Sequence, residues 1–148
     1  MTIPLLKQSE LFKKVPPEEL KVLAPLAKQK AFEPGTIIFS QNNSAEKIFV
    51  LDQGSVALKT SISDGLEITY EVIKKKGDSF GWAALIEPYR YTTTAICLEK
   101  SVAVVFERKT LYRIFPHHPL LGFRVMQNLC VLLGRRLERT RHLLASQI

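Results

Sequence analysis

The sequence is poor in the side chains on which metal centres and nucleophilic enzymes depend. Among its 148 residues there are two cysteines and three histidines, and all three histidines lie after residue 116, beyond the strand-like part of the chain. A metal-dependent β-barrel enzyme needs histidines that project from its strands. A catalytic triad needs a histidine beside a nucleophile, and an iron–sulfur sensor needs clustered cysteines. We therefore expect a protein that is not an enzyme, with no catalytic residue, metal or cofactor.

The two cysteines, Cys97 and Cys130, lie in apolar surroundings and lack the close spacing of a metal-binding pair. We expect two buried, reduced thiols, as in a cytoplasmic protein. The chain also lacks an apolar run of the roughly 20 residues that a membrane-spanning helix needs. Its first residues lack the basic start and apolar core of a secretion signal. The expected localisation is therefore cytoplasmic, without a membrane partner.

Acidic residues are outnumbered by basic ones. There are 14 aspartates and glutamates against 21 lysines and arginines, which gives a formal net charge of +7. A basic protein favours acidic partners such as phosphate ligands, nucleic acid or membrane surfaces. Part of the excess lies after residue 118, where five arginines accompany a single acidic residue. Because basic helix faces are commonly just solvated, charge alone does not select among these partners.

The pattern of the chain changes from helical to strand-like and back, and its length suits one domain. We expect a single domain with N-terminal helices over residues 1–30, a β-roll over 31–107 and C-terminal helices over 108–148. Short apolar runs between Gly-rich turns predict strands at residues 37–39, 48–51, 55–60, 66–73, 91–98 and 102–106. Such spacing is typical of a β-barrel or a jelly roll, that is, a double-stranded β-helix. The predicted fold class is therefore mainly β with flanking helices.

The last predicted helix runs from Leu120 to about Ser146 and carries apolar residues near heptad spacing. The stripe is wider than a simple coiled-coil seam. Two interpretations remain open. In one, one flank packs on the β-roll and the other on a second subunit, which makes a homodimer. In the other, a single amphipathic face packs on the core of a monomer. The stripe consists of Met126, Leu129, Leu133, Leu137 and Leu144, with Val125 and Leu132 beside it.

The most informative segment runs from Gly77 to Ile86, and Arg90 follows it closely. Two glycines flank a tight turn after a strand-like segment, and small and apolar residues then open a short helix. Free N–H groups at a helix start, glycines that permit close approach and a guanidinium together favour a bound anion. We therefore predict a site for a small anionic ligand on which the protein does no chemistry.

Four stretches stand in an informative order, namely Leu11–Leu20, Pro34–Phe39, Ile48–Gly54 and Gly77–Gly81. In this order they resemble the N-terminal helices, the second strand, the central strand with its turn glycine, and the start of the phosphate-binding cassette of the cyclic nucleotide-binding domain. That family includes catabolite-activator-type bacterial regulators and regulatory subunits of cyclic-nucleotide-dependent kinases. The resemblance covers nearly the whole chain and implies a regulatory jelly roll whose ligand is cyclic AMP or cyclic GMP.

The resemblance also implies which residues form the site. The segment that begins at Phe80 would hold the phosphate and Arg90 would grip it. On the last helix, Thr140 would contact the purine, because Arg135-Arg136-Leu137 before it resembles the dimer helix of the catabolite activators. The complete predicted set is Phe80, Gly81, Trp82, Ala83, Ala84, Arg90, Tyr91, Thr92 and Thr140.

Trp82 departs from the family's pattern, in which a glutamate accepts a hydrogen bond from the ribose 2′-hydroxyl. A hydrogen bond to a charged group contributes roughly 1.5–3 kcal/mol, and Glu87, five residues later, is not expected simply to replace it. Three interpretations remain open. The indole stacks on the ligand while affinity is lower, the pocket is adapted to another anion, or the indole fills the pocket.

Full-length regulators of the family carry a helix-turn-helix after the long helix, whereas this sequence stops at residue 148. We therefore expect no sequence-specific binding of nucleic acid. The leading hypothesis is a stand-alone sensor that binds a cyclic nucleotide or related small anion and signals through its last helix. A ligand-free scaffold with a degenerate pocket and a fragment of a transcription regulator are the alternatives.

Overall fold

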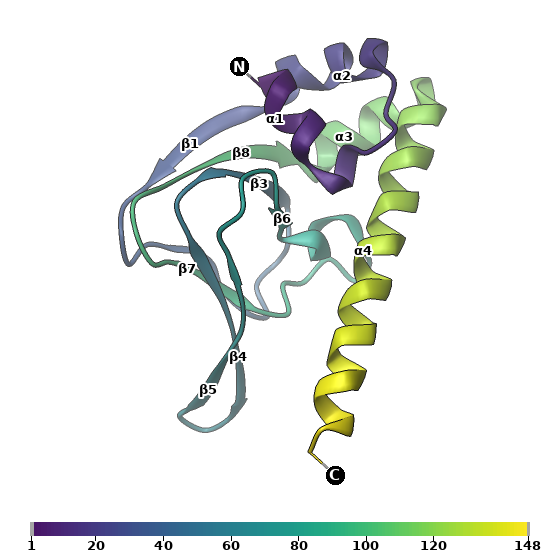
Figure 1. Cartoon of the computed structure of the whole chain (residues 1–148). Coiled ribbons are helices and arrows are strands. Elements are labelled where there is room, and N and C mark those ends of the chain that lie inside the picture. Colours follow the sequence, from purple (N-terminus) through teal and green to yellow (C-terminus); the bar gives the residue numbers. More distant parts are fainter. Residues whose placement is uncertain (1, 148) are drawn as a thin grey trace.

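The protein is a jelly roll of two antiparallel sheets, with short helices at one end and one long helix along its side (Figure 1). This computed structural model describes residues 2–147. One sheet has the strand order β1-β8-β3-β6, and the other has the order β2-β7-β4-β5. The predicted fold class, mainly β with flanking helices, is confirmed.

The strands occupy residues 28–107 of the chain. The first sheet contains β1 (Lys28–Phe32), β3 (Lys47–Gln53), β6 (Ser79–Phe80) and β8 (Ser101–Glu107). The second sheet contains β2 (Ile37–Phe39), β4 (Val56–Ser63), β5 (Leu66–Ile73) and β7 (Thr94–Cys97).

Helices flank the roll and interrupt it once. The N-terminal group is α1 (Thr2–Gln8), the 3₁₀ helix η1 (Glu10–Phe12), α2 (Pro17–Leu23) and the 3₁₀ helix η2 (Ala24–Leu26). A single 3₁₀ turn, η3 (Trp82–Leu85), lies between β6 and β7. The C-terminal group is α3 (Arg108–Ile114), the 3₁₀ helix η4 (Phe115–His117) and α4 (Pro119–Ala145).

Strands β1 and β7 differ from the sequence prediction for reasons that the structure shows. Strand β1 begins at Lys28, within the region predicted to be helical, and pairs with β8 at the edge of its sheet. Its first four residues are exposed, so it carries no apolar alternation that could reveal a strand. Strand β7 covers only Thr94–Cys97 instead of residues 91–98, because Tyr91 exchanges backbone hydrogen bonds with Asn42 and Asn43.

A cluster of buried aromatic rings lies beneath the segment predicted to hold the ligand. Phe39 stacks on Tyr91 with the ring centroids 3.8 Å apart, and Phe49 stacks on Phe80 at 5.0 Å. Phe80 is 1% exposed. These rings fill the roll where β3 meets β6, and they give the 3₁₀ turn η3 a rigid floor.

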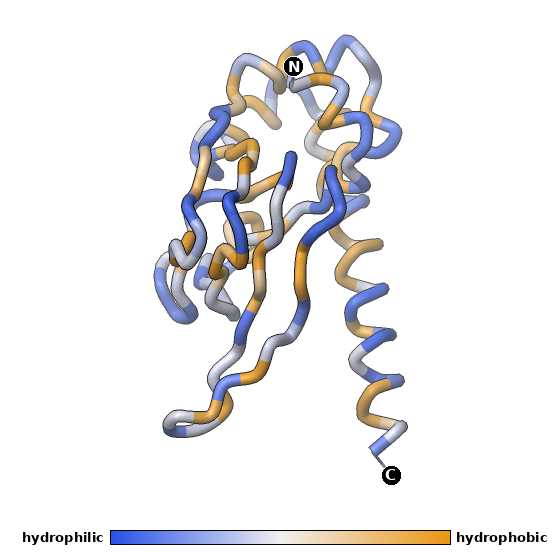
Figure 2. Tube along the Cα trace, turned by 60° about the vertical axis from the view of Figure 1, so that its left-hand side comes forward, coloured by the Kyte–Doolittle hydropathy of each residue, from blue (hydrophilic) through white to orange (hydrophobic). Residues whose placement is uncertain are grey.

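Helix α4 packs on the rest of the molecule mainly through its first half, where Leu121, Val125 and Leu129 are buried. Its second half extends alongside the β4–β5 hairpin, and hydrophobic and hydrophilic residues alternate along the whole helix (Figures 1 and 2). Between residues 2 and 147, no helix has both the length and the apolar character needed to cross a membrane.

The two cysteines have different environments. Cys97 is buried, whereas Cys130 is exposed on α4. The prediction of two buried thiols is therefore wrong for Cys130. The side chain at position 130 follows the buried Leu129 by one residue, which is about 100° around a helix, and this rotation takes the thiol away from the core.

Candidate functional site

A cavity of about 210 Å³ lies between η3, the loop of residues 86–93 and the middle of α4. It brings together most of the residues predicted from the sequence, namely Gly81, Trp82, Ala83, Arg90, Tyr91 and Thr92. It does not bring in Phe80, Ala84 or Thr140. Phe80 and Ala84 are 1% and 0% exposed and lie in the core below the cavity.

Gly81 turns the chain from β6 into η3. Its φ of +80° is in the left-handed region, and a Cβ at this position would come within 3.1 Å of the Phe49 ring and 3.2 Å of the Lys47 carbonyl oxygen. Glycine is therefore favoured on both conformational and steric grounds. After this turn, the amides of Trp82 and Ala83 start the 3₁₀ helix and have no acceptor within it.

Side chains of α3 hold η3 from behind. The Tyr112 hydroxyl donates a hydrogen bond to the Leu85 carbonyl oxygen, and the Arg108 guanidinium donates to the Ala45 carbonyl oxygen. Arg108 also stacks over the Tyr89 ring, 4.0 Å from its centroid. Burial raises the pKa of Tyr112 to about 12, so its hydroxyl remains a neutral donor at ordinary pH.

Arg90 lies in the wall of the cavity, on the loop that follows η3. Its side chain is exposed, and its Nη1 donates to the Asn42 carbonyl oxygen at 2.9 Å. Across residues 2–147, no carboxylate forms an ion pair with it. The remaining guanidinium donors are therefore available to a bound anion.

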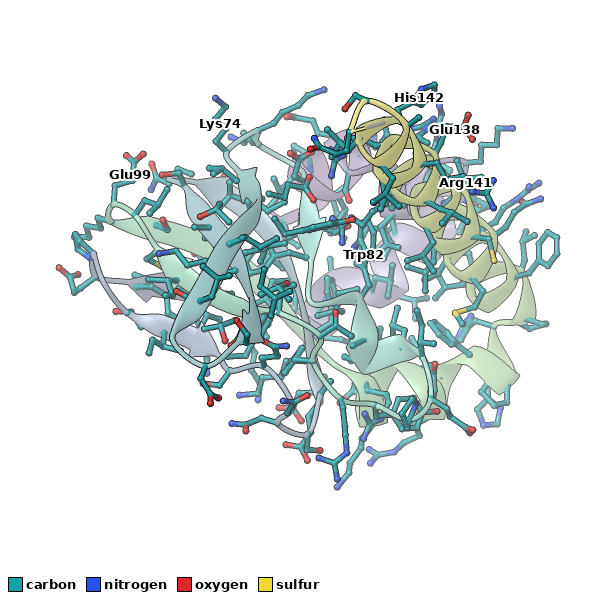
Figure 3. All side chains as sticks on the ribbon, turned by 90° about the horizontal axis from the view of Figure 1, so that it is seen from below. Lys74, Trp82, Glu99, Glu138, Arg141 and His142 are labelled. Atoms are coloured by element: carbon teal, nitrogen blue, oxygen red, sulfur yellow. The ribbon has the colours of Figure 1, made fainter. Side chains whose placement is uncertain are left out.

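Trp82 lies between the β-roll and α4 (Figure 3). Its indole Nε1 donates to the Ser79 Oγ at 2.7 Å, and the Arg136 guanidinium lies over the ring, 4.2 Å from its centroid. The indole is thus fixed in the wall of the cavity, beside its volume of about 210 Å³. Trp82 and Arg136 also line a second cavity of about 250 Å³.

Arg136 joins α4 to the hairpin as well as to Trp82. Its guanidinium pairs with the Glu71 carboxylate on β5, and Arg139 approaches the same carboxylate at 3.2 Å. Thr140 lies outside the cavity and takes part in the contact between α4 and β5. Its hydroxyl donates to the Arg136 carbonyl oxygen at 2.9 Å and lies 3.3 Å from the Tyr70 hydroxyl.

Eight wall residues were absent from the predicted set, namely Phe39, Leu58, Ile86, Glu87, Pro88, Thr93, Leu133 and Arg136. Leu133 and Arg136 are three residues apart on α4, which places them on one face of the helix. The sequence signal for Leu133 is its place in the apolar stripe of the last helix, whereas Arg136, which is polar, has no such signal. Among the described residues, no three histidine, cysteine, aspartate or glutamate side chains lie together so that they could hold a metal ion.

Comparison with known proteins agrees with this architecture. The sequence pattern of the cyclic nucleotide-binding domain matches residues 29–118, which is more than half of the chain. The chain belongs to the cyclic nucleotide-binding domain family. This match confirms the family predicted from the sequence. Members of the family are regulatory modules that bind a ligand.

Two similar proteins are bacterial regulators. The chain is 24% identical over 144 residues to the CRP-like cAMP-activated global transcriptional regulator of Mycobacterium tuberculosis. The aligned region covers 97% of this chain and 62% of the regulator. It is 26% identical over 133 residues to the cyclic AMP receptor protein of Thermus thermophilus, over 90% of this chain and 59% of that protein. The chain thus spans about 60% of the length of these relatives.

A solved cyclic nucleotide-binding domain from Methylobacillus flagellatus shares the fold with a TM-score of 0.85. It covers 99% of this chain and 82% of its own, at 17% sequence identity. The similarity thus extends to the long helix and the N-terminal helices, beyond the residues that match the family pattern.

Proposed function

We propose that the 210 Å³ cavity binds a cyclic nucleotide, cyclic AMP or cyclic GMP, and that the chain is a sensor without catalytic activity. The observation that carries the proposal is the position of Arg90 in the wall of a cavity that α4 closes on one side, where no carboxylate of residues 2–147 pairs with it. Family membership supports the same ligand class. Sequence-specific binding of nucleic acid is not part of this proposal.

The chemistry of the wall suits such a ligand. The Arg90 guanidinium would donate to the cyclic phosphate, helped by the hydroxyls of Thr92 and Thr93 and by the amides at the start of η3. Trp82 and Leu133 offer apolar surface to the sugar and the base. Few polar groups in a largely apolar wall are typical of small-molecule sites, because the polar groups set the orientation.

Signalling would use α4, which contributes Leu133 and Arg136 to the wall. A ligand that contacts these two side chains would stabilise one position of the helix against the roll. We also propose a homodimer through residues 120–146. Phe123, Cys130, Leu137 and Leu144 follow one another every seven residues on α4, and all four are exposed. A sustained seven-residue spacing favours a left-handed helix pair.

Calorimetry with cyclic AMP and cyclic GMP tests the proposal. The Arg90→Ala variant should bind at least tenfold more weakly than the wild type, because a charge-assisted hydrogen bond contributes about 1.5–3 kcal/mol. Arg113→Ala is the matched control, since Arg113 is an exposed residue of α3 outside the cavity. Equal affinity of the Arg90 variant would remove this residue from the site. Absence of binding by the wild type would favour the ligand-free scaffold.

A further inference from the structure

Glu87 lies in the wall of the same cavity as Arg90, three residues away on the same loop. Within residues 2–147, neither side chain takes part in an ion pair, although their charges are opposite. The cavity wall therefore holds one cation and one anion without an ion-pair partner in this part of the chain, whereas Arg136, also in the wall, pairs with Glu71. An anionic ligand that reaches Arg90 must also tolerate the nearby carboxylate.

The other charged groups around the cavity are already engaged. On α4, Arg136 pairs with Glu71 and stacks on Trp82. On α3, Arg108 donates to backbone carbonyl oxygens and stacks on Tyr89. Tyr112 lies near enough to Glu87 to sense its charge, but the pKa of its hydroxyl is raised to about 12, so it stays neutral. Hence, among the described residues, Arg90 is the cation of the wall that is left for the ligand, and no cation of residues 2–147 forms an ion pair with Glu87.

We infer that Glu87 selects ligands with a single negative charge, that is, cyclic phosphodiesters over phosphomonoesters. The inference rests on the proposed function. A cyclic phosphate carries one negative charge, which Arg90 matches. A phosphomonoester carries about −1.5 to −2 at pH 7, since its second pKa is near 6. The additional charge finds no free cation and is repelled by Glu87. At the effective dielectric of a protein surface, a repulsion between unit charges about 10 Å apart lowers affinity by about tenfold, and a closer approach lowers it further.

The test compares the dissociation constants of cyclic AMP and 5′-AMP for the wild type and Glu87→Gln, measured by calorimetry at pH 7.5. Because the Coulomb energy scales with ligand charge, the variant should gain more affinity for 5′-AMP than for cyclic AMP. The ratio of the two constants should narrow about tenfold. Glu87→Asp keeps the charge and should keep the wild-type ratio. Glu18→Gln, at an exposed position of α2, makes the same change in net charge far from the cavity and should also leave the ratio unchanged.

Measuring the same dissociation constants at several pH values separates selection by ligand charge from selection by ligand shape. At pH 5.5 the monoester is mostly a single anion, so the wild type should bind 5′-AMP more tightly than at pH 7.5, relative to cyclic AMP. In Glu87→Gln this gain should be smaller. A wild type that binds cyclic AMP, combined with an unchanged ratio in Glu87→Gln, would overturn the role of Glu87 alone. A wild type that binds neither nucleotide would overturn the proposed function and this inference with it.

Discussion

Replacing Arg136 with alanine should loosen α4 from the β-roll. One guanidinium makes three contacts there. It pairs with Glu71 on β5, lies 4.2 Å from the centroid of the Trp82 ring, and lies 5.2 Å from that of Tyr70. Both partners of the ion pair are half-buried, with 22% of each side chain exposed. The substitution removes all three contacts, and Arg139, 3.2 Å from Glu71, still pairs with that carboxylate.

The expected loss of stability follows from the kinds of contact. A cation–π contact contributes about 0.5–2 kcal/mol, depending on its exposure. An exposed ion pair contributes roughly 0–1 kcal/mol, whereas breaking a buried one costs about 3–5 kcal/mol. The pair with Glu71 lies between these limits, and Arg139 compensates part of its loss. We therefore expect Arg136→Ala to lower the free energy of unfolding by about 2–3 kcal/mol.

Urea unfolding at a fixed protein concentration measures this loss, since association of the chain would make the midpoint depend on concentration. Arg141→Ala is the control, because Arg141 is an exposed residue of α4 that makes no ion pair between residues 2 and 147 (Figure 3). A double-mutant cycle with Trp82→Phe isolates the coupling between ring and guanidinium. If Arg136→Ala destabilised the protein no more than Arg141→Ala, the contacts of Arg136 with β5 and Trp82 would not stabilise the packing of α4 on the β-roll.

Three further predictions concern the turn, its support and the helix pair. Gly81→Ala should lower stability by about 1–2 kcal/mol in thermal unfolding, because φ is +80°. Gly134→Ala, in open space on α4, should instead raise it by up to about 1 kcal/mol. Tyr112→Phe should remove the hydrogen bond to Leu85 and lower stability by about 1 kcal/mol. In the wild type the pKa of Tyr112 is about 12, so the stability that its hydrogen bond contributes is complete below pH 10 and is lost as the pH rises through 12. Titration of the phenolate absorbance of the wild type, compared with that of Tyr112→Phe, measures this pKa. If α4 forms a parallel pair, mild oxidation should cross-link two copies through Cys130, and Cys130→Ser should abolish the cross-link.

The fold was predictable where the sequence carries strong local signals. The Ser63-Asp64-Gly65 turn predicted a return strand over residues 66–73, and β5 is Leu66–Ile73. The long helix was predicted to within one residue at each end. Strand β1 was missed because it is an exposed edge strand with a polar sequence, and only its pairing with β8 makes it a strand.

The site was predictable to the extent that it is local in the sequence. Gly81 to Ala83 and Arg90 to Thr92 lie within twelve residues, and one turn followed by one loop brings them together. Arg136 was missed because it reaches the cavity through the packing of α4, which periodicity does not specify for polar residues. Thr140 was placed in the site by resemblance alone, and it lies one turn beyond the residues of α4 that line the cavity.

Trp82 connects the cavity to α4, because the indole lies in the cavity wall and the Arg136 guanidinium lies over it. Two of the residues that line the cavity, Leu133 and Arg136, belong to α4. A ligand shifts a conformational equilibrium only through contacts that differ between the two states. Under the proposed function, substitutions at Arg90 would therefore change affinity with little effect on the position of the helix. Substitutions at Leu133 or Arg136 would change the coupling even where affinity is kept, because both residues belong to α4 and Arg136 also pairs with Glu71 on β5.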